Sequence, residues 1–349
     1  MERKTSSISD QIKERLLNAK AKGDKPPHNG DTSRIVSTGS TLLDLAISGG
    51  RVRGGGVPGG ILVEIFGPAG CGKTVMLCEL AGAVQRQGGQ VMFKDPEARL
   101  NKQFAQLFDM DVNEIDYSMP STVPEVFAPI RKWQPEGEGV VHGIFADSLA
   151  ALSTEWEMND KDQYGMRRAK EFSEELRKTC RIITEKGFLL ACSNQVRQNL
   201  DAGPYGQKFK SPGGEAIGFY ASLRLRCGNP RKLKKTRKIA GKDVDRIYGV
   251  ETEVEVYKSS VWEPYRTAPV YIIFDYGIDD IRANLQFVKT SKDEKVYVLG
   301  EEKLDKSIDK AIAIIEQDDR VDELREEVIE LWQEIEEKFK TERRGKRIG

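Results

Sequence analysis

The chain has 349 residues, of which 38% are hydrophobic and 32% charged, enough to bury a substantial core without disulfides or metals. Its 55 basic and 55 acidic residues balance, so net charge favours no class of partner, and the five cysteines and two histidines lack the paired spacing of a zinc site or a disulfide framework. The charged amino terminus has no apolar secretion signal, and no stretch reaches the roughly 18 to 20 apolar residues that cross a bilayer. We therefore expect a soluble, cytoplasmic protein without a membrane partner.

Residues 1–34 are predicted to form a short helix followed by a linker. Ile8, Ile12, Leu16 and Leu17 recur at helical spacing. Residues 21–33 are rich in Gly, Pro, Asn, Asp and Ser, which favour turns. This segment is expected to be an amino-terminal arm outside the core.

From residue 35 to 281, apolar runs alternate with amphipathic segments of helical length. The runs are ILVEIF (61–66), QVMF (90–93), GIFAD (143–147), GFLLACS (187–193) and YASLRLR (220–226). This alternation predicts an α/β core with a mostly parallel, doubly wound sheet and helices on both faces. Two later runs, GVETEVEVY (249–257) and APVYIIF (268–274), alternate like antiparallel strands.

Residues 282–349 are strongly charged and predict a small α/β carboxy-terminal domain that ends in a charged helix. The expected helix has an apolar stripe at three- and four-residue steps, formed by Val321, Leu324, Val328, Leu331 and Ile335. Such a stripe fits packing on the rest of that domain, or a coiled-coil partner.

A phosphate-binding loop is the strongest motif. It follows an apolar strand, opens a helical segment and consists of Gly67, Pro68, Ala69, Gly70, Cys71, Gly72, Lys73 and Thr74. Its backbone N–H groups would cradle the phosphates of ATP, while Lys73 reaches the β/γ oxygens and Thr74 binds Mg²⁺. The alternative is a glycine-rich turn.

Two acidic positions at strand ends are candidates for the same site. Asp147 ends the strand GIFAD, where it could hold Mg²⁺ or cap a helix. Glu97, in the segment Lys94 to Glu97 after QVMF, could activate the attacking water or lie in a solvated turn. Spacing alone does not decide between these two interpretations of Glu97.

The chain resembles the RecA recombinases of bacteria and their viruses. The resemblance rests on STGSTLLDLAISGG, GPAGCGKT, KDPEARL, FADSLAAL, CSNQVR and SPGGEAIGFYASLRLR. It implies a RecA-like core, the catalytic carboxylate at Glu97, and a γ-phosphate-sensing glutamine at Gln195. It also implies adenine contacts at Asn101 and Phe104, and an amino-terminal arm that contacts the next subunit of a helical filament.

Two loops would then face single-stranded DNA. The first, residues 155–165, leads into a helix that carries Arg168 and Arg177. The second, residues 197–214, includes Arg197, Tyr205, Lys208, Phe209, Lys210, Gly213 and Gly214. Cations track phosphates and aromatic rings stack on bases, although basic surface loops are also common.

A basic run between Arg231 and Lys238 includes Lys234, Lys235 and Arg237. We expect it at the tip of a hairpin with no counter-charge nearby, where it could bind a second DNA strand or a duplex backbone. The alternative is a solvated face.

The chain departs from the family pattern at several positions. Lys258 matches the first of two lysines that reach a neighbour's γ-phosphate, and is a catalytic candidate, but the second position is Ser260. Glu253 and Glu255 stand where the family's second DNA site is basic. Despite these departures, the resemblance implies a DNA-dependent ATPase that forms filaments for strand exchange, served by loader or single-strand-binding proteins. The alternatives are a RecA-fold regulator or loader without strand exchange, and a hexameric helicase motor.

Overall fold

The computed structural model describes residues 30–100, 105, 107–108, 110–153, 166–195, 197–198, 209–210 and 216–342. The helix predicted near residues 8–17 lies outside these residues. Within the described ranges, none of the helices has the length and apolar character needed to cross a membrane.

The core is a ten-stranded sheet, and six neighbouring strands in it are parallel. In spatial order these are β10 (Leu223–Cys227), β3 (Leu62–Gly67), β7 (Leu189–Gln195), β6 (Gly143–Ala146), β4 (Val91–Lys94) and β5 (Ile115–Ser118). The antiparallel strands are β11 (Arg231–Ile239), β12 (Lys242–Ser259), β13 (Thr267–Ile273) and β14 (Gly277–Ile278). The predicted α/β fold class with a mostly parallel sheet is confirmed.

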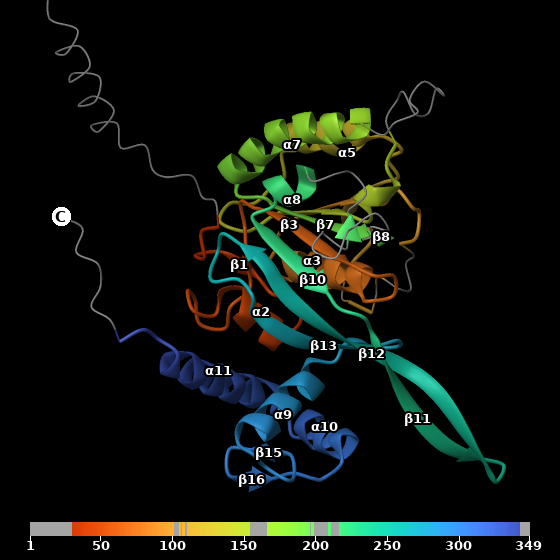
Figure 1. The fold of residues 1–349 in the computed structure, drawn as a ribbon, viewed down its shortest axis with the longest axis vertical. Coiled ribbons are helices and arrows are strands. Elements are labelled where there is room, and N and C mark those ends of the chain that lie inside the picture. Colours follow the sequence, from red (N-terminus) through yellow and green to blue (C-terminus); the bar gives the residue numbers. More distant parts are fainter. Residues whose placement is uncertain are drawn as a thin grey trace, which may run out of the picture.

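Helices cover both faces of this sheet because each strand alternates its apolar side chains between them. On one face, Leu62, Ile144 and Leu190 pack against α5 (Val123–Lys132), α7 (Met166–Lys186) and α8 (Ala216–Tyr220). On the other, Val63 and Phe145 pack with α2 (Thr41–Ser48) and α3 (Lys73–Arg86). Figure 1 shows α5, α7 and α8 together on one side of the strands.

Short elements complete the core. They are β1 (Ile35–Val36) paired with β2 (Val57–Pro58), the 3₁₀ turn η1 (Leu149–Ala151), and β8 (Arg197–Gln198) paired with β9 (Phe209–Lys210). The carboxy-terminal region contains α9 (Asp280–Ser291), β15 (Val298–Leu299), β16 (Glu302–Lys303), α10 (Ile308–Gln317) and α11 (Val321–Lys338).

The helix predicted from the stripe at residues 321–335 is α11, and the middle of its apolar stripe is buried within this chain, whereas Val321 is exposed. Leu324 and Val328 are fully buried, and α11 contacts both α9 and α2. The ring centroids of Trp332 and Trp262 lie 5.5 Å apart, and Arg266 forms an ion pair with Glu336. The helix α11 therefore packs on α2 of the core as well as on α9 of the carboxy-terminal region.

The carboxylate of Asp44 is fully buried in α2. It accepts hydrogen bonds from Thr38 N (2.8 Å), Thr38 Oγ1 (2.7 Å) and Ser37 Oγ (2.5 Å). Burial nevertheless raises the pKa of Asp44 from 3.8 to about 6. The folded protein therefore holds this proton more tightly than the unfolded chain does. The cost of ionising Asp44 is absent below pH 3.8 and complete above about pH 6.

We expect Asp44→Asn to remove this cost. Relative to the parent, the variant should gain roughly 2 kcal/mol in free energy of unfolding between pH 4 and pH 7, at 1.36 kcal/mol per pKa unit, because part of the cost is already present at pH 4. Urea unfolding of both proteins at the two pH values measures the difference. A difference that does not change with pH would contradict the role given to Asp44.

Candidate functional site

The phosphate-loop residues 67–72 join β3 to the start of α3. Gly72 precedes the helix with a φ of 93°, in the left-handed region that favours glycine. A Cβ built on Gly72 would lie 2.1 Å from Cδ1 of Ile272, so a side chain at this position would also displace the end of the Ile272 side chain on β13. The free N–H groups at the start of α3 make the loop suited to an anion.

The ammonium of Lys73 lies inside the curve of the loop. Its Nζ donates hydrogen bonds to the carbonyls of Pro68 (2.7 Å) and Gly67 (3.2 Å), and lies 3.7 Å from Cys71 Sγ. Lys73 is buried, so its charge is held against the backbone rather than in solvent.

Asp147 follows β6 and lies beside the first turn of α3. Its Oδ2 accepts a hydrogen bond from Thr74 Oγ1, and its Oδ1 accepts one from Ser193 Oγ on β7. Burial raises the pKa of Asp147 because it disfavours the charged form. A hydroxyl and a carboxylate oxygen in contact are ligands that Mg²⁺ takes, and a divalent cation would offset the cost of the buried charge. The residues present thus fit a magnesium ion.

Glu97 lies after β4 with a side chain that is 15% exposed. Its Oε1 accepts a hydrogen bond from Ser148 Oγ (2.8 Å), and its Oε2 lies 2.7 Å from Arg99 Nη2. The neighbouring Asp95 does not line the cavity that Glu97 reaches, and it accepts hydrogen bonds from Leu100 N (2.8 Å) and Tyr117 OH (3.0 Å). Asp95 fixes the turn, and Glu97 is the carboxylate of this segment that reaches the cavity.

These side chains line a cavity of about 270 Å³ at the carboxyl ends of β3, β6 and β7. The structure brings together the predicted residues Ala69, Gly70, Gly72, Lys73, Thr74, Glu97, Asp147 and Gln195. Val250, Ile272 and Phe274 also line it, and the sequence analysis missed them. They come from β12 and from β13 and the residue after it, far along the chain, so no local motif could identify them.

The remaining predicted nucleotide and DNA contacts either lie outside the described residues or are placed only on an element. Asn101, Phe104, Tyr205, Lys208, Gly213 and Gly214 lie outside the described residues. Arg168 falls in the first turn of α7, Arg197 in β8, and Phe209 and Lys210 in β9. Arg177 is exposed on α7. The pairing of β8 with β9 places the start of the second predicted DNA loop, shortly after Gln195, beside residues 209–210 of the same loop.

Lys258 lies away from the cavity of its own chain. On β12, Lys258 pairs with Arg224 of β10, and Arg224 in turn pairs with Glu64 near the start of β3. The phosphate loop follows the other end of β3, so Lys258 and the loop lie at different heights along the sheet. The Nζ of Lys258 donates to the carbonyls of Gly218 and Phe219, each at 3.0 Å. Burial, together with the nearby Arg224, lowers the pKa of Lys258.

The basic run from Arg231 to Lys238 forms one strand of a hairpin, β11, rather than its tip, which lies at Ala240 and Gly241. The expectation of no nearby counter-charge was wrong. Arg231 forms an ion pair with Glu251 across the hairpin, and Lys235 lies 2.7 Å from Asp309 on α10. Figure 1 shows β11 and the start of β12 extending away from the core.

The two faces of this hairpin differ in charge, because cross-strand partners share a face. One face carries the pairs Lys234/Ile247, Thr236/Asp245 and Lys238/Asp243, so its charges largely cancel. The other carries Lys235/Arg246, Arg237/Val244 and Ile239/Lys242. Within the described stretch 231–247, this second face has no acidic residue of its own, and we call it the cationic face.

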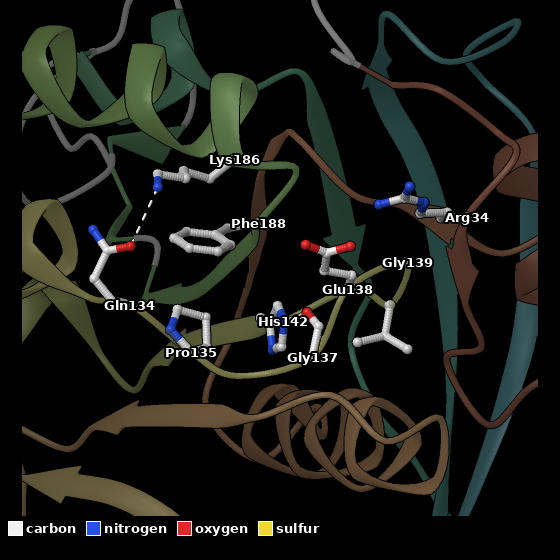
Figure 2. Close-up of a pocket in the computed structure, with 10 residues that line it drawn as sticks. Arg34, Gln134, Pro135, Gly137, Glu138, Gly139, His142, Lys186 and Phe188 are labelled. Atoms are coloured by element: carbon white, nitrogen blue, oxygen red, sulfur yellow. Dashed lines mark hydrogen bonds between the residues drawn. The ribbon is translucent and has the colours of Figure 1, made fainter.

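A larger cavity of about 610 Å³ lies at the opposite end of the parallel strands (Figure 2). Arg34, Glu138, Lys186 and Phe188 line it together with His142. Nδ1 of His142 accepts from Gln90 N (3.0 Å), and Nε2 lies 3.0 Å from the carbonyl of Gly137, so both ring nitrogens are occupied by backbone. None of the predicted site residues lines this cavity.

Comparison with known proteins identifies relatives over most of the chain. The RecA N-terminal domain family matches residues 23–279. Protein RecA of Thermus thermophilus is 31% identical over 321 residues, which cover 90% of this chain and 89% of that protein. Protein RecA of Delftia acidovorans is 33% identical over 247 residues (70% and 63%), and that of Borrelia hermsii is 30% identical over 310 residues (86% and 82%).

Proposed function

Since this chain belongs to the RecA family, we propose that it is a DNA-dependent ATPase that polymerises on single-stranded DNA. In this proposal the filament promotes homologous pairing and strand exchange in recombination and repair. The cavity at the phosphate loop is the observation that carries it, because it joins an anion-binding loop, a cation-binding oxygen pair and a carboxylate within one pocket.

Nucleotide binding is assigned to the loop and its neighbours. Lys73 binds the phosphates, while Thr74 and Asp147 hold Mg²⁺ through the oxygens that already lie in contact. When bound, Mg²⁺ neutralises charge that develops on the phosphate oxygens. Phe274, a residue that is 57% exposed and lines the cavity, offers an apolar surface for the base, and further base contacts are assigned to Asn101 and Phe104 by the family resemblance.

Glu97 is assigned as the general base for the attacking water. Its partners Ser148 and Arg99 hold the carboxylate from two sides and leave it at the cavity wall. Gln195 ends β7 in the same cavity, and β8 begins two residues later. A change in the contacts of Gln195 with the γ-phosphate would therefore act directly on the loop 197–214, which we assign to single-stranded DNA.

The assembly we propose is a helical homo-oligomer. Lys258 is too far along the sheet to serve its own nucleotide, so its catalytic role requires the nucleotide of a neighbouring copy. Duplex or second-strand DNA is assigned to the cationic face of the hairpin of β11 and β12, which carries Lys235 and Arg237, whereas Lys234 lies on the other face beside Asp243 and Asp245 and is not part of the proposed contact. Cytoplasmic location and loader or single-strand-binding proteins as partners belong to the same proposal.

A second candidate is a RecA-fold regulator or loader that exchanges no strands. Two observations favour it: Ser260 replaces a lysine, and the exposed Glu253 replaces a basic residue. Electron microscopy of the protein with single-stranded DNA and a non-hydrolysable ATP analogue separates the candidates. Extended helical filaments are the expected result. Closed rings would identify a helicase motor instead, and absence of either assembly would favour the regulator.

A further inference from the structure

Two buried cysteines meet beneath the phosphate loop. Cys71 belongs to the loop, and Cys227 ends β10; they are 0% and 2% exposed. Their thiols form a hydrogen bond with each other. A Cβ built on Gly67 would lie 2.8 Å from Cys227 Cβ and 3.1 Å from Cys71 Sγ, so both cysteines border the small space that Gly67 leaves open.

Cys71 differs chemically from the other four cysteines of the chain. The hydrogen bond from Cys227 and the ammonium of Lys73, whose Nζ lies 3.7 Å from Cys71 Sγ, lower the pKa of the Cys71 thiol to about 7. Burial raises the pKa of Cys78, Cys180 and Cys192, and the hydrogen bond to Cys71 raises that of Cys227. Thiolate, the reactive form, therefore concentrates on Cys71.

We propose that Cys71 and Cys227 form a reversible oxidation site, in which a peroxide converts the two thiols to a disulfide. Oxidation of this site weakens ATP binding, and ATP binding slows the oxidation. The Cys71 thiolate attacks one peroxide oxygen, the O–O bond breaks, and the released hydroxide takes up a proton to leave as water. The resulting sulfenic acid is attacked by Cys227 sulfur; the S–O bond breaks, and a second water leaves with the Cys227 proton. Two thiols are oxidised and one peroxide is reduced, and a thiol reductant reverses the change.

The opposition between oxidation and ATP rests on the proposed role of Lys73. One ammonium cannot serve both partners fully, so phosphates that engage Lys73 withdraw a cation from the Cys71 thiolate. Conversely, an S–S bond ties the loop to the end of β10 and removes the freedom of the loop to close around phosphates. Because the coupling is reciprocal, ATP protects the thiols and the disulfide excludes ATP.

Peroxide treatment of the full chain tests the pairing. Trypsin releases Cys71 in peptide 54–73 and Cys227 in peptide 227–231, and we expect mass spectrometry to find these two joined and lighter by two hydrogens. Cys227→Ser should give no joined peptide, while Cys180→Ser, a control for the other cysteines, should behave as the parent. Absence of the joined peptide from the parent, at peroxide levels that oxidise Cys180, overturns the proposal.

Nucleotide binding is measured on the same samples with a fluorescent ATP analogue. Binding should be lost in the oxidised parent and restored by dithiothreitol. Saturating Mg·ATP should slow formation of the joined peptide on the order of tenfold, within the usual range of coupling between sites. Unchanged rates or unchanged binding overturn the opposition. If the reduced parent binds no ATP, the proposed nucleotide site fails, and the joined peptide still decides the pairing.

Discussion

Glu97→Gln should lower ATP turnover by a factor of roughly 10² to 10⁴, the usual contribution of a general base, while ATP and DNA affinities stay near those of the parent. Glutamine keeps the size of the side chain and an oxygen that can accept from Ser148, but it cannot take the proton of water. Phosphate release at saturating single-stranded DNA measures turnover, and analogue binding measures affinity. Hydrolysis at the parental rate would refute the role of Glu97.

The same substitution at an exposed position provides the matched control. Glu301→Gln lies in the turn between β15 and β16, away from the cavity, and should leave turnover unchanged. Loss of the ion pair between Glu97 and Arg99 has little effect on stability, because Arg99 is 70% exposed and such pairs contribute about 0 to 1 kcal/mol. Urea unfolding of Glu97→Gln should therefore match the parent within about 1 kcal/mol.

Much of the fold was predictable because the central strands are continuous apolar runs. The predicted runs at 61–66, 90–93, 143–147 and 187–193 correspond to β3, β4, β6 and β7, each of which is buried almost throughout. The strand β5 was missed. It lies at the edge of the sheet, is half-exposed and has the sequence Ile-Asp-Tyr-Ser, which carries neither an apolar run nor clear alternation.

The candidate site was predictable where its residues are contiguous or end a strand. The loop from Gly67 to Thr74 is a local motif, and Asp147 follows a buried strand whose carboxyl end must face the same edge. The wall formed by Val250, Ile272 and Phe274 depends on the pairing of β12 with β10 and β13, which no local pattern specifies. The register that separates Lys258 from the loop has the same long-range origin.

Charge partners on the hairpin were unpredictable for a related reason. Glu251 lies across the hairpin from Arg231, and Asp309 belongs to a helix of the carboxy-terminal region. A count of charges along the chain shows a basic run without acidic residues. The cross-strand pairing of β11 with β12 divides that run between the cationic face and a face where acidic residues balance the lysines. The division gives the DNA-binding hypothesis a sharper test than reversal of the whole run.

Reversing two charges on the cationic face, in Arg237→Glu/Lys242→Glu, should weaken binding of duplex DNA on the order of tenfold at moderate salt. The slope of log affinity against log salt should fall in magnitude by roughly 2, about one per lost phosphate contact. The hairpin is about 30 Å long, at about 3.4 Å per residue, and extends away from the core. Because both substituted side chains are exposed on it, the fold should not change. Fluorescence anisotropy over a salt series measures both quantities.

Lys234→Glu/Lys238→Glu is the control, with the same change in net charge on the opposite face. There Asp243 and Asp245 already offset the lysines, so phosphates gain little from this face and the salt slope should stay near the parental value. Equal losses in the two variants would mean that DNA responds only to the net charge of the hairpin. Unchanged affinity in both would remove the hairpin from the DNA-binding surface and leave the loop 197–214 as its main part.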